Sequence, residues 1–261
     1  MLASHQPTSP LPMPDSSIAH SAIAAQSNQS NQFNQSNQSG PLRLYLDTAE
    51  VDAYKKWLPT GLFYGVTCNP LLLEKANVAC TPSRLIALAE QACLLGCQEV
   101  HLQSWGSSPE ELIKTGRTLS QANNRVVVKL PATQIGATAA RVLIQEGIPV
   151  TLTAVYAVHQ VLIAAALGAS YAAPYLGRIK DSGKDGLAEI TNMQAALNGV
   201  GSSTRLLTAS IRQIEDISVL ATKGVDTFTF SEAIAQSFFH QLDTDKAVAD
   251  FEQAAQKMSH E

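Results

Sequence analysis

The sequence has 261 residues, 45% hydrophobic and 15% charged, which permits one large domain or two small ones with a sizeable core. Its formal net charge of −4 offers no basic field for nucleic acid or an anionic membrane surface. The sequence contains no run of about 18 apolar residues, which a membrane span needs, and no basic and apolar signal segment at its start. We therefore expect a cytoplasmic protein with no nucleic-acid or membrane partner.

The first forty residues differ in composition from those that follow. An Asn/Gln/Ser-rich tract over residues 27–40 contains almost no apolar side chains. Such a tract cannot offset the conformational entropy lost on ordering. We predict a disordered tail over residues 1–40, with a partner-binding tail as the alternative, and a folded domain over residues 41–261.

From residue 42 onward, short apolar runs alternate with longer helical patterns. Several runs are continuously apolar, which is typical of strands covered on both faces. The predicted strands are 42–46, 64–66, 100–102, 126–130, 148–152, 171–173, 205–208 and 227–230. The predicted helices are 82–95, 109–123, 136–146, 157–167 and 243–258.

Eight strands that alternate with helices predict parallel βα units in the α/β class. Eight such units in roughly 220 residues match a compact (β/α)8 TIM barrel. An open, doubly wound sheet is the alternative, and it would usually carry a glycine-rich loop after its first strand. Here the first predicted strand leads into Asp47-Thr48-Ala49-Glu50, without glycine, which favours the barrel.

In a barrel of this kind, chemistry is expected at the carboxyl ends of the strands. The polar groups at these predicted ends can hold a polyol, a carbonyl or a phosphate. They are Asp47, Thr67, Asn69, Gln103, Ser104, Lys129, Thr151, Thr153, Tyr175, Arg178, Ser210, Arg212, Ser231 and Glu232.

Lys129 is the most unusual residue of this set. Strand side chains alternate between faces, so Val127 and Lys129 share one face and the apolar residues 126, 128 and 130 share the other. If the apolar set faces the helices, Lys129 points into the barrel, where lysine is rare. A desolvated amine is a good nucleophile towards a ketone and forms an imine. An inward ion pair with Asp47 or another carboxylate is the structural alternative.

Seven segments in chain order resemble the small-subunit transaldolase family, which includes fructose-6-phosphate aldolase. They are Leu44-Tyr45-Leu46-Asp47-Thr48, Gly65-Val66-Thr67-Cys68-Asn69-Pro70, Val127-Val128-Lys129-Leu130-Pro131, Gly147-Ile148-Pro149, Thr153-Ala154-Val155-Tyr156, Ala173-Pro174-Tyr175-Leu176-Gly177-Arg178-Ile179 and Ala209-Ser210-Ile211-Arg212. The resemblance extends from about residue 42 to the last predicted helix. It leaves the Asn/Gln/Ser-rich tract outside.

The resemblance implies a barrel in which Lys129 forms an imine with a dihydroxyacetone unit. It implies that Asp47 contacts substrate hydroxyls and assists proton transfer, and that Asn69 holds a substrate hydroxyl. A catalytic water would be positioned by three further residues, Gln103, Thr153 and Tyr175. The donor phosphate would be held by Arg178, Ser210 and Arg212.

Each of these residues also has a purely structural interpretation. Asp47 could cap a helix, Asn69 could be a turn residue, and the two arginines could form surface ion pairs. Ordinary packing or hydrogen bonding could account for Gln103, Thr153 and Tyr175. His101 would share the inward face with Gln103, and we interpret it as a packed core histidine.

Other chemistries find little support in the sequence. The six histidines show no metal-ligand spacing, and there is no GxGxxG, P-loop or GxSxG motif. Cys93 and Cys97 would share one face of the predicted helix over 82–95, where buried small residues are favoured over a metal or redox site. We therefore expect no cofactor and no metal.

The resemblance leaves two reactions open, because an aldolase protonates the dihydroxyacetone carbanion whereas a transaldolase passes it to an aldehyde. Fructose-6-phosphate aldolases resemble this chain in having Gln and Tyr at the positions of Gln103 and Tyr175, where transaldolases usually have Glu and Phe. Arg212 is more similar to transaldolases. The aldolase is favoured, with the transaldolase of the pentose phosphate pathway and a non-catalytic binding protein as alternatives. The resemblance also implies a phosphorylated sugar substrate and a homo-oligomer, a pentamer or decamer.

Overall fold

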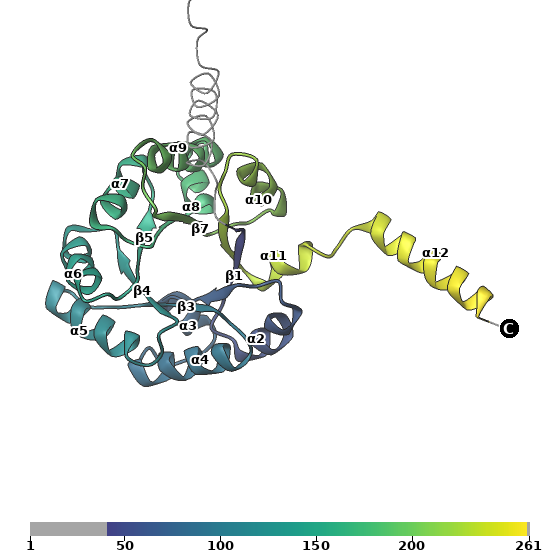
Figure 1. Cartoon of the computed structure of the whole chain (residues 1–261), viewed down its shortest axis with the longest axis horizontal. Coiled ribbons are helices and arrows are strands. Elements are labelled where there is room, and N and C mark those ends of the chain that lie inside the picture. Colours follow the sequence, from purple (N-terminus) through teal and green to yellow (C-terminus); the bar gives the residue numbers. More distant parts are fainter. Residues whose placement is uncertain (1–40, 260–261) are drawn as a thin grey trace, which may run out of the picture. The chain divides into compact units, whose positions relative to one another are not determined.

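Eight parallel strands close into a barrel in the order β1 to β8, which confirms the predicted (β/α)8 TIM barrel (Figure 1). A computed structural model of the chain describes residues 41–259, and the predicted tail over residues 1–40 lies outside the described residues. The strands are β1 (Arg43–Asp47), β2 (Gly65–Thr67), β3 (Glu99–Gln103), β4 (Val126–Pro131), β5 (Val150–Val155), β6 (Tyr171–Pro174), β7 (Arg205–Thr208) and β8 (Thr227–Phe230).

Helices follow the strands, and all but the last of them form the outer layer of the barrel (Figure 1). They are α2 (Val51–Trp57), the short 3-10 helix η1 (Leu58–Thr60), α3 (Pro70–Lys75), α4 (Pro82–Leu94), α5 (Pro109–Ser120), α6 (Gln134–Gln145), α7 (Val158–Leu167), α8 (Leu176–Asp181), α9 (Gly186–Gly199), α10 (Ile214–Ala221), α11 (Glu232–Ser237) and α12 (Leu242–Met258).

The ends of the helices follow local capping interactions. The hydroxyl of Ser108 accepts a hydrogen bond from the Glu111 amide at the start of α5, as expected for a cap before proline. Helix α6 begins two residues before its predicted start, because the hydroxyl of Thr133 accepts from the Gly136 amide. Cys97 was wrongly placed on the same helix as Cys93, because α4 ends at Leu94 and Gly96 then takes a left-handed conformation with φ 94°.

The alternation of β4 follows the prediction. Val126, Val128 and Leu130 pack in the large core between the strands and the helices. Val127 instead belongs to a separate cluster inside the barrel, together with Tyr45, Tyr171, Ala173 and Leu207. Lys129 therefore lies on the inner face with Val127, one layer nearer the carboxyl end of the barrel.

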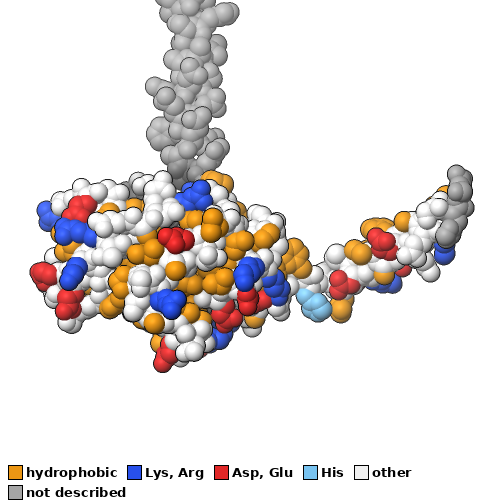
Figure 2. Space-filling model, turned by 90° about the horizontal axis from the view of Figure 1, so that it is seen from below, with side chains coloured by type: hydrophobic (Ala, Val, Ile, Leu, Met, Phe, Trp, Pro, Cys, Tyr) orange, Lys and Arg blue, Asp and Glu red, His pale blue; other side chains and the backbone are white. Residues whose placement is uncertain are grey.

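The last helix, α12, buries none of its residues within the described chain. Its exposed apolar side chains are Leu242, Val248, Phe251 and Met258, and apolar side chains are visible along this helix in Figure 2. The same view shows positive and negative side chains interspersed on one side of the barrel. Within residues 41–259, no helix has the combination of length and apolar character that crossing a lipid bilayer requires.

Gly136 offers a test of the packing of α6 against the end of the lysine strand. A Cβ atom at Gly136 would lie 1.9 Å from the carbonyl oxygen of Pro131, so the backbone would have to shift. We expect Gly136→Ala to lower the free energy of unfolding by about 2 kcal/mol or more, measured by urea denaturation. Gly199→Ala is the matched helical control, because a Cβ there meets nothing within 4 Å and should change stability by less than about 1 kcal/mol. Equal midpoints for the two variants would contradict this packing.

Candidate active site

A cavity of about 560 Å³ lies at the carboxyl ends of the strands. Seven of the nine predicted site residues line it, namely Asp47, Asn69, Gln103, Lys129, Tyr175, Arg178 and Ser210. Thr153 and Arg212 are not part of the lining, although each lies next to residues that are. The barrel thus brings together most of the side chains that the sequence placed at separate strand ends.

Lys129 lies at the base of this cavity and is 5% exposed. Its Nζ donates a hydrogen bond to the backbone carbonyl of Cys68 at 3.0 Å. In the sheet register Lys129 lies beside Gln103 on β3 and Thr151 on β5, so the three side chains share the inner face. The Cys68 carbonyl is the hydrogen-bond partner found for the Lys129 amine within the described chain. Among residues 41–259, Lys129 forms no direct ion pair with a carboxylate.

Asp47, at the end of β1, lines the same cavity as Lys129. Its Oδ1 accepts a hydrogen bond of 2.5 Å from the hydroxyl of Thr67, which also contacts the hydroxyl of Thr229 at 2.6 Å. Burial raises the pKa of Asp47, while the positive charge of Lys129 and the Thr67 hydrogen bond act in the opposite direction. Asp47 does not cap a helix, since Glu50 occupies the N-cap position of α2.

Asn69 has a structural role and also faces the cavity. Its Oδ1 accepts hydrogen bonds from the amides of Leu71 at 3.0 Å and Leu72 at 3.2 Å, and thereby caps α3. Because the oxygen is occupied in this way, the NH2 group is the part of Asn69 that can donate to a ligand hydroxyl. The cap and the ligand contact are therefore compatible.

Thr153 lies behind the cavity lining, in contact with Tyr175. The hydroxyl oxygens of Thr153 and Tyr175 are 2.8 Å apart. Of the two residues, Tyr175 lines the cavity. Between Thr153 and Val155 the register of β5 against β6 shifts by a bulge, and Ala154 takes a left-handed conformation with φ 60°. Alanine in this conformation is strained. The sequence analysis missed this bulge, since an alanine gives no sign of it.

The two arginines of the predicted phosphate site occupy different positions. The guanidinium of Arg178 lies 5.0 Å from the ring centroid of Tyr175 and donates to the Tyr156 hydroxyl at 3.4 Å. Arg212 is exposed and forms a two-point ion pair with Asp181, with one contact of 2.6 Å. Its carboxylate partner explains why Arg212 does not reach into the cavity wall.

Gly177 is a further residue whose role the sequence analysis did not identify. A Cβ atom there would lie 2.5 Å from the carbonyl oxygen of Ser210 and 2.7 Å from Nε of Arg212. Ser210 itself has a left-handed backbone with φ 58°. The absence of a side chain at Gly177 thus permits the close approach that brings the loop after β7 alongside the start of α8.

The carboxyl-end cavity, with an enclosed lysine and a carboxylate beside it, is the arrangement of a (β/α)8-barrel enzyme. Within residues 41–259, no group of three or more His, Cys, Asp or Glu side chains is arranged to hold a metal ion. Residues 44–261 match the family model described as transaldolase/fructose-6-phosphate aldolase. The chain belongs to this family.

Curated relatives extend this result over most of the chain. A protein of Kosmotoga olearia named "Probable transaldolase" is 33% identical over 80% of this chain and 94% of its own length. Proteins with the same name from a Hydrogenobaculum species and from Methanococcus maripaludis are each 30% identical. These two alignments cover 83% and 80% of this chain, and 99% and 95% of the relatives.

The hydrogen bond between Thr67 and Asp47 provides a test of the electrostatics of the cavity. It favours the ionised carboxylate, so Thr67→Val should raise the pKa of Asp47 and move its titration to higher pH. The measurement is a carbon NMR titration of aspartate-labelled protein. Thr229→Val is the control, because it removes the neighbouring hydroxyl and retains the Thr67–Asp47 hydrogen bond. A titration of Asp47 at lower pH in Thr67→Val would refute this account.

Proposed function

We propose that the protein is a class I aldolase that cleaves or forms fructose 6-phosphate from dihydroxyacetone and glyceraldehyde 3-phosphate. The observation that carries this proposal is the Lys129 amine, buried at the base of the carboxyl-end cavity beside Asp47. A buried lysine next to a carboxylate suits imine chemistry, since the amine must lose and regain protons during each turnover. The proposal requires no metal and no cofactor.

In the proposed reaction, the Lys129 amine attacks the C2 carbonyl of fructose 6-phosphate and water leaves to give the imine. Asp47 then takes the proton of the C4 hydroxyl while the C3–C4 bond breaks. The bonding electrons move into the imine to form an enamine, and glyceraldehyde 3-phosphate departs. Protonation of the enamine at C3 and addition of water release dihydroxyacetone and the free amine.

Three further groups support this sequence of steps. Gln103 lies beside Lys129 in the sheet register, and Tyr175 reaches the cavity with its hydroxyl paired to Thr153. These three can hold the water that enters and leaves as the imine forms and hydrolyses. The NH2 group of Asn69 can donate to a hydroxyl of the dihydroxyacetone unit.

The substrate phosphate is assigned to Arg178, Ser210 and Arg212. Arg178 and Ser210 already line the cavity, and Arg212 is brought close to Ser210 through Gly177. A phosphate could compete with Asp181 for the guanidinium of Arg212, because both offer paired oxygens to its planar donors. Two guanidinium groups and one hydroxyl suit a terminal phosphate.

A transaldolase is the second candidate, in which the enamine attacks an aldehyde such as erythrose 4-phosphate and is not protonated. Arg212 and the names of the similar proteins from Kosmotoga olearia and Hydrogenobaculum favour it. Gln103 and Tyr175 favour the aldolase, since a tyrosine hydroxyl can deliver a proton and phenylalanine cannot. Transfer between sugar phosphates would place the protein in the pentose phosphate pathway.

The last helix and the cysteines bear on assembly and location. The exposed apolar side chains of α12, such as Phe251, support a homo-oligomer in which a second copy covers them, with a pentamer or decamer as the expected ring assemblies. The four cysteines are all free thiols, which supports a reducing compartment such as the cytoplasm.

A coupled assay tests the proposed reaction. Fructose 6-phosphate is supplied alone, and release of glyceraldehyde 3-phosphate is followed; the same assay is then repeated with erythrose 4-phosphate. An aldolase releases both products repeatedly without an acceptor. Turnover that starts only when erythrose 4-phosphate is added would replace the aldolase with the transaldolase, and no turnover in either assay would reject both.

Tyr175→Phe tests the role of the tyrosine hydroxyl. Its loss removes the partner of Thr153 and the group proposed to deliver the proton to the enamine. Release of dihydroxyacetone should fall by about tenfold or more, while transfer to erythrose 4-phosphate is retained. Tyr156→Phe is the matched control for the ratio of release to transfer, because this tyrosine lies edge-on to Tyr175 and outside the cavity lining. Its hydroxyl contacts Arg178, whose phosphate contact both reactions share, so the ratio should stay unchanged. An unchanged ratio of release to transfer in Tyr175→Phe would refute the assignment.

A further inference from the structure

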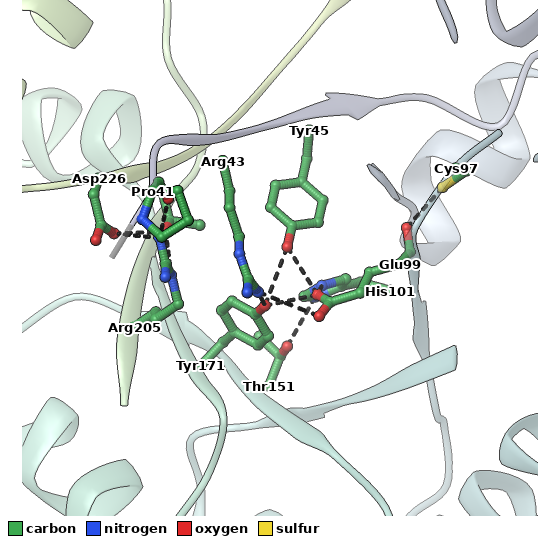
Figure 3. A network of polar contacts seen from close by, with 11 residues as sticks. Pro41, Arg43, Tyr45, Cys97, Glu99, His101, Thr151, Tyr171, Arg205 and Asp226 are labelled. Atoms are coloured by element: carbon green, nitrogen blue, oxygen red, sulfur yellow. Dashed lines mark hydrogen bonds and ion pairs between the residues drawn. The ribbon is translucent and has the colours of Figure 1, made fainter. Parts of the chain in front are cut away.

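A second cavity, of about 570 Å³, lies at the amino ends of the barrel strands. Because the strands are parallel, it is at the opposite mouth of the barrel from Lys129. Its charged lining residues come from the starts of four strands and are Arg43, Glu99, Arg125 and Arg205. Figure 3 shows three of these side chains, those of Arg43, Glu99 and Arg205, within one polar network.

Glu99 is the one carboxylate that lines this cavity, and both of its oxygens already have partners inside the barrel. Oε1 of Glu99 pairs with Arg43 at 3.3 Å. Its Oε2 accepts from the hydroxyls of Tyr171 at 2.6 Å and Tyr45 at 2.8 Å, and contacts Nε2 of His101 at 3.2 Å (Figure 3). Burial alone would raise the pKa of Glu99, but these hydrogen bonds lower it to about 2. Glu99 therefore adds no unmatched negative charge to the cavity.

The positive charge of Arg205 is likewise paired with a carboxylate, that of Asp226. Its Nη2 lies 3.0 Å from Oδ1 of Asp226 and donates to the carbonyl of Pro41 at 2.6 Å, and its Nε donates to Thr227 at 2.9 Å. These contacts fix the orientation of the Arg205 guanidinium, which Figure 3 shows beside Asp226 and Pro41. Asp226 itself is not part of the cavity lining.

Arg125 has no such carboxylate partner among residues 41–259. Its Nη1 donates to the backbone carbonyl of Cys97 at 2.8 Å, which anchors the side chain without neutralising it. In addition, Nε of Arg43 is buried and has no hydrogen-bond partner within the described chain. The three guanidinium groups of the lining are thus matched by two carboxylates, Glu99 on the lining and Asp226 outside it. This leaves one excess positive charge at the cavity, on a chain whose net charge is negative.

We propose that this cavity binds a phosphate group, either as inorganic phosphate or on a small metabolite. Planar guanidinium groups match the paired oxygens of phosphate, and side chains of Ser170, Ser203 and Asn124 on the same lining can donate further hydrogen bonds. The site lies at the far end of the barrel from the phosphate group of the proposed substrate.

The test uses the full-length double variant Arg178→Ala/Arg212→Ala, so that phosphate bound at the carboxyl-end cavity does not obscure the result. Inorganic phosphate is titrated by calorimetry at constant ionic strength. Glycerol 3-phosphate and glycerol, which have no carbonyl for Lys129 to attack, are titrated in parallel. We expect one phosphate per chain and no binding of glycerol. Tighter binding of glycerol 3-phosphate than of inorganic phosphate would identify a metabolite as the ligand, and the reverse would identify the free ion.

Two substitutions in this background locate the phosphate. Arg125→Gln removes the unmatched charge, and Asn124→Asp adds a negative charge on an exposed side chain, so its fold should be unaffected. Each should weaken phosphate binding at least tenfold, whereas Lys114→Gln, on the exposed face of α5, should leave it unchanged.

Two results would overturn this inference. One is a background variant that binds no phosphate, and the other is phosphate binding that Asn124→Asp leaves unaltered. Neither result depends on whether Lys129 catalyses the proposed reaction, since binding is measured without turnover. If Arg178 and Arg212 bind no phosphate, the double variant and the unaltered protein should bind phosphate equally well at the amino-end cavity.

Discussion

The hydrogen bond from the Lys129 amine to the Cys68 carbonyl is the contact around which the candidate active site is organised. It exists because the sheet closes on itself, which turns every second side chain of β4 into the barrel. In an open sheet the same lysine would face a helix layer or water. Closure of the barrel thus converts a simple alternation of side chains into an enclosed amine at the base of a cavity.

The interior of the barrel is polar on both sides of its small apolar cluster, and hydrogen bonds connect these polar groups. Below Lys129, Nδ1 of His101 contacts the hydroxyl of Thr151 at 2.9 Å, and His101 is fully buried, as expected for a core histidine. Thr67, which pairs with His101 in the sheet register, joins Asp47 to Thr229. Satisfied buried polar groups have few alternative arrangements. The side chains of the candidate site are therefore held in place before any ligand binds.

Much of the fold could be predicted from the sequence because each strand carries a local signal. The predicted limits of β7 and β8 agree with the structure, and the inward position of Lys129 follows from the apolar residues on either side of it. Features that depend on contacts between distant segments could not be predicted. The bulge at Ala154 and the ion pair of Arg212 with Asp181 are of this kind. So is the network around Glu99, which needs side chains from β1, β3 and β6 together.

The central claim is that the amine of Lys129 forms a covalent imine with the substrate. The most direct measurement is borohydride reduction in the presence of fructose 6-phosphate, followed by mass spectrometry of the peptides, with Lys129→Met as the control. The account predicts loss of activity and a reduced dihydroxyacetone adduct on Lys129 alone, with no adduct in the variant. Full activity after reduction, or an adduct on a different lysine, would contradict it.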